Sequence, residues 1–466
     1  MGIAYLWAML NRRKFRPTRP FSPKGKFLVA CVRGIFGLRR LFGGRDYDAV
    51  WPEHHEDPLY MKRKEQVYFG HKYYYRAITK DDPDSGIAKR LSSGDGDLGL
   101  PMHAENGTTI TLSAGGDLMP YACINAKQCK HLWDEVGEAF FQADIVTANL
   151  ETPIDVKKPA SVVPEVMLNH MYFNGSEEMF EVFSGNGKYK GYDVLSVANN
   201  HSLDLGIQGL HNTLEFLENK KIAYCGAAKS QELRDAFPIL ERKGIRIAFL
   251  AATFSLNAEQ LPEDKNWMVN HLSLNRENPD IDVLVQQAKR AREKGADLIV
   301  AHLHMGCAYQ PFPSGHTVRN MEKICRATGI DLVLGGHPHN PQPTEIFRYP
   351  DPFTGEEKQS LVVYSMGDFV AYDIFKWCHL PITYRFHITK KDAKTFISKV
   401  EPQVYFAEAN FRSGKVDRLQ FRNYSRLQQQ RNFIDAASEK EFVELEQFAK
   451  QFLLPGNLSQ WMSKTL

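Results

Sequence analysis

"YDVLSVANNHSLDLG", residues 192–206, sets an apolar run directly before two asparagines and a histidine. The run from Val194 to Ala198 has the composition of a buried strand, and the residues from Leu210 to Leu217 repeat leucine at helical spacing. Polar side chains at the end of a buried strand are costly unless each finds a partner. The stretch therefore predicts a strand followed by a helix, with functional polar residues between them.

The same alternation of apolar runs and amphipathic segments fills the chain from residue 108 onward. Further apolar runs typical of strands lie at residues 108–114, 143–149, 222–226, 245–252, 296–304, 331–336 and 361–367. Helices are predicted over 281–294 and 318–328. Apolar strands separated by helices predict an α/β domain over residues 108–400, with helices covering its sheets. The charged stretch 401–466 predicts a C-terminal helical extension.

The beginning of the chain is strongly basic, although the formal net charge of the whole chain is only +3. Residues 1–44 contain no Asp or Glu and are predicted to form a basic segment. Within it, residues 26–42 predict either an amphipathic helix on an anionic membrane surface or a basic tail that packs on the protein or is disordered. Residues 45–107 predict an irregular extension and linker. The nearly neutral total argues against a nucleic-acid partner.

Cysteine usage and hydropathy bear on the compartment. The seven cysteines are scattered and form no C-x-x-C pair, which favours reduced thiols in the cytosol over a disulfide framework. The apolar residues 2–10 precede the basic residues and are too few to span a bilayer, so we recognise no signal peptide or transmembrane helix. The sequence therefore predicts a cytoplasmic protein, peripheral at a membrane at most.

The polar residues that would be costly to bury share one predicted position, the carboxyl ends of the strands. They are Asp117, Asn149, Glu151, Asn199, Asn200, His201, His302, His304, His337 and His339. Ligands bind at this edge in α/β folds because loops converge there on a rigid sheet. Mixed carboxylate, carboxamide and imidazole ligands suit Mn, Fe or Zn, and one bridging carboxylate can hold two such ions. A hydroxide bound to these ions is nucleophilic near neutral pH.

Two pairs of histidines refine this prediction. Strand periodicity places His302 and His304 on the same face, so one can be a ligand while the other is a satisfied core histidine. His337 and His339 follow two glycines that let the backbone approach closely. No G-x-S-x-G elbow or Walker loop occurs, which leaves covalent catalysis by a side chain without a candidate.

Six segments resemble those of the CapA family of capsule or poly-γ-glutamate synthesis proteins in order and rough spacing. They are GDLMP (116–120), ADIVTANLETPI (143–154), SVANNHSLDLGIQGLHNTLEFL (196–217), HLHMGCAY (302–309), GIDLVLGGHPHNPQPTEIF (329–347) and VVYSMGDF (362–369). The resemblance covers about residues 108–375. It implies the fold of the calcineurin-like metallophosphoesterases, a layered pair of sheets flanked by helices with metal ions at the strand ends.

The resemblance also implies a role for each residue of the site. It assigns the metal ions to Asp117, Glu151, Asn200, His304, His337 and His339. Among these, Asp117 would hold the first ion, Glu151 would bridge, and Asn200 would hold the second. The catalytic residue would be His201, placed to protonate the leaving oxygen. Substrate binding is predicted for Asn149, Asn199, Tyr309 and Asp368.

The chain departs from the resembled family pattern in two of its motifs. The motif His-Trp-Gly-x-Glu-Tyr is here His304-Met-Gly-Cys-Ala308-Tyr309, without the glutamate. Gly-Asn-Phe has become Gly-Asp368-Phe, which adds a possible negative charge near the site. Like the resembled family, the chain lacks the Asp-x-His of enzymes with the same fold, since Asp117 is followed by Leu118 and Met119.

The implied role is capsule or poly-γ-glutamate biosynthesis. One hypothesis is a metal-dependent hydrolase of phosphoester bonds that uses metal-bound hydroxide on a polymer or a phosphorylated intermediate. The alternative is a non-catalytic, membrane-associated component of polymer synthesis or export, which retains a metal or polymer binding site and uses the basic N-terminus to meet the membrane and the synthesis machinery. A hydrolase of peptide-like bonds with the same ions also fits the ligand types.

Overall fold

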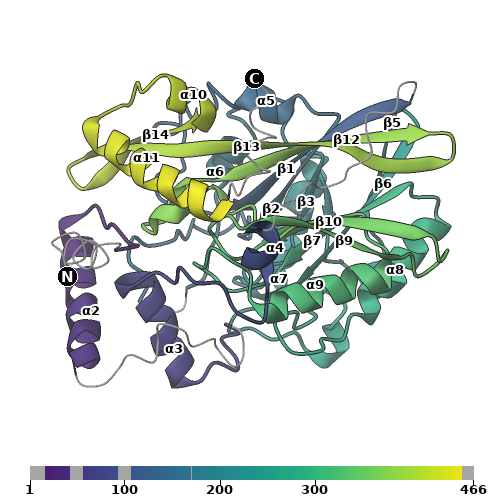
Figure 1. The fold of residues 1–466 in the computed structure, drawn as a ribbon, viewed down its shortest axis with the longest axis horizontal. Helices are drawn as coiled ribbons and strands as arrows, with labels where there is room; N and C mark the ends of the chain where they lie inside the picture. The colour runs from purple at the N-terminus through teal and green to yellow at the C-terminus, as the bar shows by residue number, and fades with distance from the viewer. Residues whose placement is uncertain (1–15, 42–55, 93–106, 169–170, 454–466) are drawn as a thin grey trace.

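The computed structural model describes residues 16–41, 56–92, 107–168 and 171–453. The remaining parts of the predicted basic segment, linker and C-terminal extension lie outside the described residues. The described chain is built on two β-sheets that contact each other and are flanked by helices (Figure 1). The predicted α/β class with two sheets flanked by helices is therefore confirmed.

The first sheet has eight strands. Its path runs β14 (Lys415–Asn423), β13 (Lys394–Arg412), β12 (Ile382–Lys391), β1 (Thr108–Leu118), β2 (Ile145–Leu150), β3 (Val194–Ser196) and β4 (Ala223–Cys225), with β11 (Asp368–Val370) also paired to β1. Strands β1 to β4 are parallel, while β12 to β14 are antiparallel. The parallel half is buried on both faces, as its apolar runs predict.

The second sheet has six strands. Its order is β5 (Ile239–Arg242), β6 (Ile245–Thr253), β7 (Leu298–His304), β8 (Leu332–Gly336), β10 (Glu357–Val363) and β9 (Thr344–Pro350). Strands β6, β7, β8 and β10 are parallel, and the outer strands β5 and β9 are antiparallel to their neighbours. Every residue of β7 and β8 is buried.

Amphipathic helices pack on these sheets. They include α5 (Gly137–Phe141), α6 (Glu177–Phe183), α7 (Gly206–Asn219), α8 (Asp282–Glu293) and α9 (Gly315–Thr328). Helix α8 contacts β6, α9 contacts β9, and the two helices contact each other at the lower right of Figure 1. Helices α7, α8 and α9 confirm the helices predicted from leucine and apolar spacing.

The helical extension predicted for 401–466 is wrong for residues 401–423. These residues complete β13 and form β14, joined by a two-residue turn in which Ser413 and Gly414 have φ of 51° and 73°. Their charges are paired across the hairpin, since Arg422 donates to Glu408 at 2.5 Å. Helices follow only from residue 424, as α10 (Tyr424–Gln429), α11 (Ala436–Phe448) and a π-helical turn (Ala449–Leu453).

The segment 56–92, predicted to be irregular, has defined structure. It contains α3 (Arg63–Gly70), a π-helical turn η2 (His71–Tyr75) and α4 (Ile87–Ser92). Tyr73 of η2 donates to Asp373 at 2.7 Å, across 300 positions of sequence. Tyr73 and Tyr74 are buried in the main hydrophobic core, so they attach this segment to the domain.

The basic residues 23–41 form helix α2 (Pro23–Leu41), drawn in purple at the left of Figure 1. One face packs on the protein, where Val29 is fully buried and Arg33 donates to the carbonyl oxygen of Thr18 at 2.6 Å. The opposite face is exposed. The segment thus forms a helix that packs on the protein, and its contact with a membrane surface stays a prediction.

The fold brings two sets of strand ends together. The carboxyl ends of β1, β2 and β3 in the first sheet meet those of β7 and β8 in the second, where β1 contacts β8. Thr147 of β2 and His302 of β7 join the sheets through a 2.8 Å hydrogen bond. Residues that follow these strands therefore converge on one volume.

Candidate metal centre

Three acidic residues and three histidines converge at these strand ends. Their potential ligand atoms form three groups, each with all atoms within 4.8 Å of one another. The groups are Glu151, His337 and His339; Asp117, Glu151 and His304; and Asp117, His339 and Asp368. All are buried. The structure thus brings together five of the six predicted metal ligands and adds Asp368, which the sequence assigned to substrate binding.

Several polar atoms of this cluster are buried without a partner. Both oxygens of Glu151, both ring nitrogens of His337 and Oδ2 of Asp368 make no hydrogen bond among the described residues. Buried polar atoms left unpaired cost about 1–3 kcal/mol each. A divalent cation would satisfy them, and the donor set of carboxylates and imidazoles suits Mn, Fe or Zn. The residues present therefore fit the implied metal.

Asp117 lies at the end of β1 and is held from two sides. Its Oδ1 accepts a hydrogen bond from Nδ2 of Asn149 at 2.8 Å, and its Oδ2 accepts one from the backbone N–H of His337 at 3.1 Å. Burial, together with the nearby charge of Glu151, raises the pKa of Asp117 to about 7. In the absence of a cation, this carboxylate therefore binds a proton readily.

His304 ends β7 and faces the acidic residues. Its Nε2 lies 2.7 Å from Oδ1 of Asn200 and 3.4 Å from Oε1 of Glu151. Asn200, the sixth predicted ligand, thus reaches the cluster through its amide oxygen. His302 instead pairs with Thr147, so it is the satisfied core histidine of the two. Burial lowers the pKa of both imidazoles to about 3, which keeps them neutral.

The loop after β8 shows why glycines precede its two histidines. A Cβ on Gly336 would lie 2.7 Å from Oδ1 of Asp117 and 3.1 Å from Nδ1 of His304. The predicted close approach of the backbone is therefore present. His337 and His339 have φ of 90° and 61°, values that side chains with a Cβ rarely adopt. Such strain is characteristic of functional sites.

His339 is paired with Asp368 on β11. Its Nδ1 lies 2.9 Å from Oδ1 of Asp368, and its ring stacks on Tyr309 with centroids 5.2 Å apart. Although burial alone lowers it, the pKa of His339 is raised to about 10 because Asp368 stabilises the imidazolium. Burial raises the pKa of Asp368 to about 7. The Tyr309 hydroxyl points elsewhere and donates to Asp373 at 3.3 Å.

His201 lies beside the cluster and is about as exposed as His339, a member of the cluster. Its Nδ1 is 2.7 Å from Oδ2 of Asp204, and its ring stacks on Phe173 with centroids 4.1 Å apart. These contacts fix the imidazole orientation, while 11% of the side chain remains exposed. Asn199 holds the loop in place by donating to the carbonyl oxygen of Leu150 at 2.7 Å.

One acidic residue of the site was missed by the sequence analysis. Glu56 is buried beside His337, with Oε2 of Glu56 and Nε2 of His337 3.7 Å apart. It comes from the segment predicted to be an irregular linker, where no apolar periodicity or motif marks it. The nearest available signal was Ala308, which stands where the resembled motif has a glutamate.

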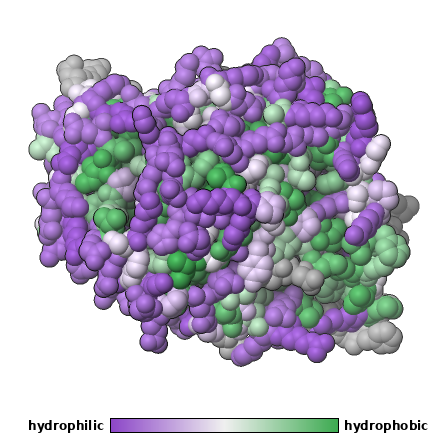
Figure 2. All heavy atoms as spheres, turned by 180° about the vertical axis from the view of Figure 1, so that it is seen from behind, coloured by the Kyte–Doolittle hydropathy of each residue, from purple (hydrophilic) through white to green (hydrophobic). Residues whose placement is uncertain are grey.

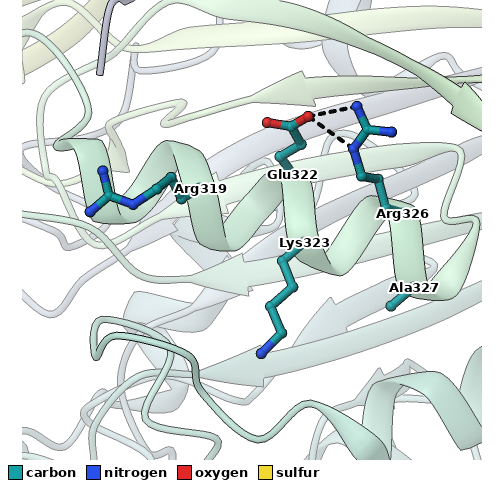
Figure 3. A pocket seen from close by; sticks show the side chains of 5 residues that line it. All are labelled: Arg319, Glu322, Lys323, Arg326 and Ala327. Carbon is teal, nitrogen blue, oxygen red and sulfur yellow. Dashed lines mark hydrogen bonds and ion pairs between the residues drawn. The ribbon is translucent and has the colours of Figure 1, made fainter. Parts of the chain in front are cut away.

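A surface hollow on helix α9 lies apart from this cluster (Figure 3). It is lined by Arg319, Glu322, Lys323, Arg326 and Ala327, and Arg326 donates to Glu322 at 2.7 Å. All five side chains come from one helix, and none is buried. The hollow therefore offers no enclosed chemistry comparable to the strand-end cluster.

Comparison with known proteins gives a sequence family and several relatives, including two CapA proteins. The family described as "Bacterial capsule synthesis protein PGA_cap" matches residues 111–373. The capsule biosynthesis protein CapA of Bacillus anthracis is 26% identical over 58% of this chain and 61% of its own length. The PGA biosynthesis protein CapA of Bacillus subtilis is 24% identical over 56% of this chain and 63% of its own.

The chain thus spans about three fifths of the length of these curated relatives. Among solved structures, the calcineurin-like phosphoesterase YfkN from Bacillus subtilis aligns with 74% of this chain and 100% of that chain, at 12% identity and a TM-score of 0.34. A TM-score this low carries no argument, so the assignment to a family rests on the sequence match. Because that match covers more than half of the residues, the chain belongs to the bacterial capsule synthesis protein family PGA_cap.

Proposed function

We propose that this chain is a metal-dependent hydrolase of phosphoester bonds that acts in the synthesis of a capsule or poly-γ-glutamate-type polymer. The biosynthetic setting is supported by the names of its relatives, which are capsule and PGA biosynthesis proteins. The observation that carries the chemistry is the set of unpartnered buried atoms on Glu151, His337 and Asp368. Its substrate would be a polymer or a phosphorylated intermediate.

The residues that would hold the cations are Asp117, Glu151, Asn200, His304, His337 and His339, with Asp368 beside them. Asp117 and Glu151 each belong to two of the three ligand groups, and Glu151 is the candidate for the bridging carboxylate because both of its oxygens lack a hydrogen-bond partner among the described residues. Bound divalent cations would supply Lewis-acid polarisation of a phosphoryl oxygen. Two bound cations fit the overlapping ligand groups better than one, because a single ion of this kind coordinates fewer than seven donors.

His201 is proposed as the proton donor to the leaving oxygen. Asp204 holds Nδ1 and so leaves Nε2 to exchange a proton with substrate. The carboxylate of Asp204 also accepts the backbone N–H of Phe173 at 2.7 Å, which ties the stacking ring to the same acid. The imidazole is therefore oriented before substrate arrives.

Substrate binding by Asn149, Asn199, Tyr309 and Asp368 stays a prediction. Their polar groups bond to Asp117, Leu150, Asp373 and His339, respectively. These contacts favour an additional role for all four residues in positioning the centre.

The direct test is a hydrolase screen of the full chain purified with Mn²⁺. Wild type and Glu151→Gln would be compared on an aryl phosphate, an aryl phosphodiester and a γ-glutamyl peptide. We expect Mn²⁺-dependent release of the aryl alcohol by wild type and its loss in the variant. Turnover of the peptide alone would replace phosphoester hydrolysis with hydrolysis of peptide-like bonds. Bound Mn²⁺ with no turnover of any substrate would instead support the non-catalytic component.

Helix α2 favours membrane association as a second property. Phe27, Ile35 and Leu38 are 69%, 66% and 59% exposed, and exposed basic residues such as Lys26 and Arg39 lie on the same helix. Figure 2 is turned by 180° from Figure 1, so the side of α2, at the left of Figure 1, is at the right of Figure 2, where hydrophobic surface gathers in the lower part. Among the described residues, none of the helices has the length and apolarity needed to cross a bilayer. We therefore propose peripheral binding to an anionic surface.

The membrane proposal predicts that the full chain sediments with anionic vesicles and not with neutral ones. The double variant Phe27→Glu/Ile35→Glu should stay in the supernatant with its fold unchanged, because both side chains already face solvent. Equal sedimentation of wild type and variant with anionic vesicles would refute a role for α2. This result would also remove the support for a membrane-associated component.

A further inference from the structure

The N-terminal segment contributes a buried ion pair to the edge of the candidate metal centre. Glu56 and Lys72 have side chains that are 2% and 0% exposed, and their charged groups are in direct contact. The Lys72 ammonium also lies 5.1 Å from the ring centre of Phe69. Both residues belong to the segment 56–92, which precedes the domain predicted for residues 108–400 in the sequence and packs on it.

The two oxygens of Glu56 have different surroundings. Oε1 accepts from the Lys72 ammonium, whereas Oε2 accepts the backbone N–H of Ala308 at 2.7 Å and lies 3.7 Å from Nε2 of His337. Glu56 thus joins a point 252 positions away in the sequence. Ala308 is the position at which the chain lacks the glutamate of the resembled motif, so a carboxylate from elsewhere reaches that place.

The neighbouring residue fixes this arrangement on the domain. Oδ1 of Asp57 accepts a hydrogen bond from Oγ of Ser255 at 3.2 Å, and the same Ser255 Oγ accepts the backbone N–H of Asn257 at 2.9 Å. Asn257 in turn accepts a hydrogen bond from Asn200 at 3.0 Å. The segment around Glu56 is therefore connected to two sides of the cluster, through His337 and through Asn200.

A gain in folding stability does not explain why the chain has such a buried ion pair. Desolvating two charges costs several kcal/mol per ion, and replacing a buried ion pair by apolar residues of similar size is often neutral or stabilising. A charged carboxylate held next to a ring that offers two unpartnered nitrogens has a different use. Histidines that bind metals commonly donate their second ring N–H to a carboxylate, which fixes the tautomer and the ring orientation.

We propose that Glu56 is a positioning residue of the metal centre, which accepts the Nε2–H of His337 and leaves Nδ1 as the nitrogen that binds the cation. Lys72 keeps the carboxylate charged and oriented in its apolar surroundings. The N-terminal segment is then part of the centre, although it lies outside the residues that match the family. This inference rests on the metal ions of the proposed function but not on turnover.

The test compares cation binding by the wild-type full chain with that of the double variant Glu56→Gln/Lys72→Met. Replacing both partners avoids leaving either charge buried and alone, so the variant should fold. We expect Mn²⁺ to bind about 10- to 100-fold more weakly, as is usual when the partner of a metal-binding histidine is lost. The visible absorption spectrum of bound Co²⁺ should also change, because the orientation of His337 changes.

Asp82→Asn is the matched control. Asp82 is a buried carboxylate of the same segment whose Oδ2 accepts the backbone N–H of Gly315 at 2.7 Å, at the start of α9. Its removal should leave the Mn²⁺ affinity and the Co²⁺ spectrum unchanged, whatever it does to the unfolding temperature. A general loosening of the segment would instead lower the affinity in both variants and overturn the inference.

Two further outcomes would also overturn it. One is a double variant that binds Mn²⁺ as tightly as wild type with an unchanged Co²⁺ spectrum, and the other is a wild-type chain that binds neither ion. Tight binding without hydrolysis of any phosphoester would refute the proposed function and leave the role of Glu56 intact. The two proposals can therefore fail separately.

Discussion

Lowering the pH should weaken cation binding through Asp117. The pKa of this carboxyl is raised to about 7 by burial and by Glu151, so a proton and a cation compete for it in the acidic range. Between about pH 8 and about pH 5.5 this competition alone weakens the apparent affinity about 30-fold, or about 2 kcal/mol. His304 and His337, with pKa values lowered to about 3 and about 4, stay neutral over this range. Protons on Asp368 and His339, whose pKa values are raised to about 7 and about 10, compete with the cation in the same direction as the proton on Asp117.

The stability of the metal-free protein should change in the corresponding direction. Because the folded pKa of Asp117 lies above the ordinary value of 3.8, its contribution to stability is present below that value and is lost as the pH rises through about 7. Mn²⁺ replaces the missing proton at higher pH. The rise in unfolding temperature on adding Mn²⁺ should therefore be larger at about pH 8 than at about pH 5.5.

Calorimetric titration of Mn²⁺ across this pH range measures the effect. Repeating each titration in two buffers of different ionisation enthalpy gives the number of protons released on binding, which should increase as the pH falls. Asp117→Asn should bind more weakly at high pH and show a flatter pH dependence. An affinity of wild type that is independent of pH would refute the account of Asp117.

Three substitutions separate the roles of neighbouring residues. His201→Ala should lower turnover of an aryl phosphate about 100-fold or more while the bound Mn²⁺ is retained, and loss of Mn²⁺ would show that it is a ligand instead. Asp204→Asn should lower kcat with little change in KM, because it orients His201, and an unchanged kcat would contradict this role. His302→Ala should lower the free energy of unfolding by about 2–4 kcal/mol in urea titrations, since it loses the Thr147 hydrogen bond and leaves a cavity, yet bind Mn²⁺ normally.

The two sheets and the position of the site at the strand ends were predictable from sequence, because local patterns of apolar and polar residues determine both. Apolar runs such as 296–304 gave strands, and the polar residues that end them, such as His304, necessarily lie at one edge of a parallel sheet. Spacing alone could not separate His302 from His304, since both share a strand face. The hydrogen bond between His302 and Thr147, on a strand of the other sheet, distinguishes the two histidines. No local sequence pattern predicts this contact.

Long-range pairing also explains the errors. The charges of β13 and β14 resemble those of a surface helix, but Arg422 and Glu408 neutralise each other across a hairpin. Glu56 lies in a stretch without periodicity, and its role becomes visible only once Ala308 and Lys72 are placed beside it. Such contacts form only in the folded chain, and no pattern of residue spacing in the sequence predicts them.

The most direct test of the central claim is a crystal structure of the Zn²⁺-loaded chain with anomalous data collected at the zinc edge. The account predicts an anomalous peak about 2 Å from oxygen of Glu151 and from ring nitrogens of His337 and His339. A second peak between Asp117, Glu151 and His304 would show that two ions bind, with Glu151 shared between them. Full zinc loading with no anomalous density at this cluster, or with density only at surface residues, would contradict it.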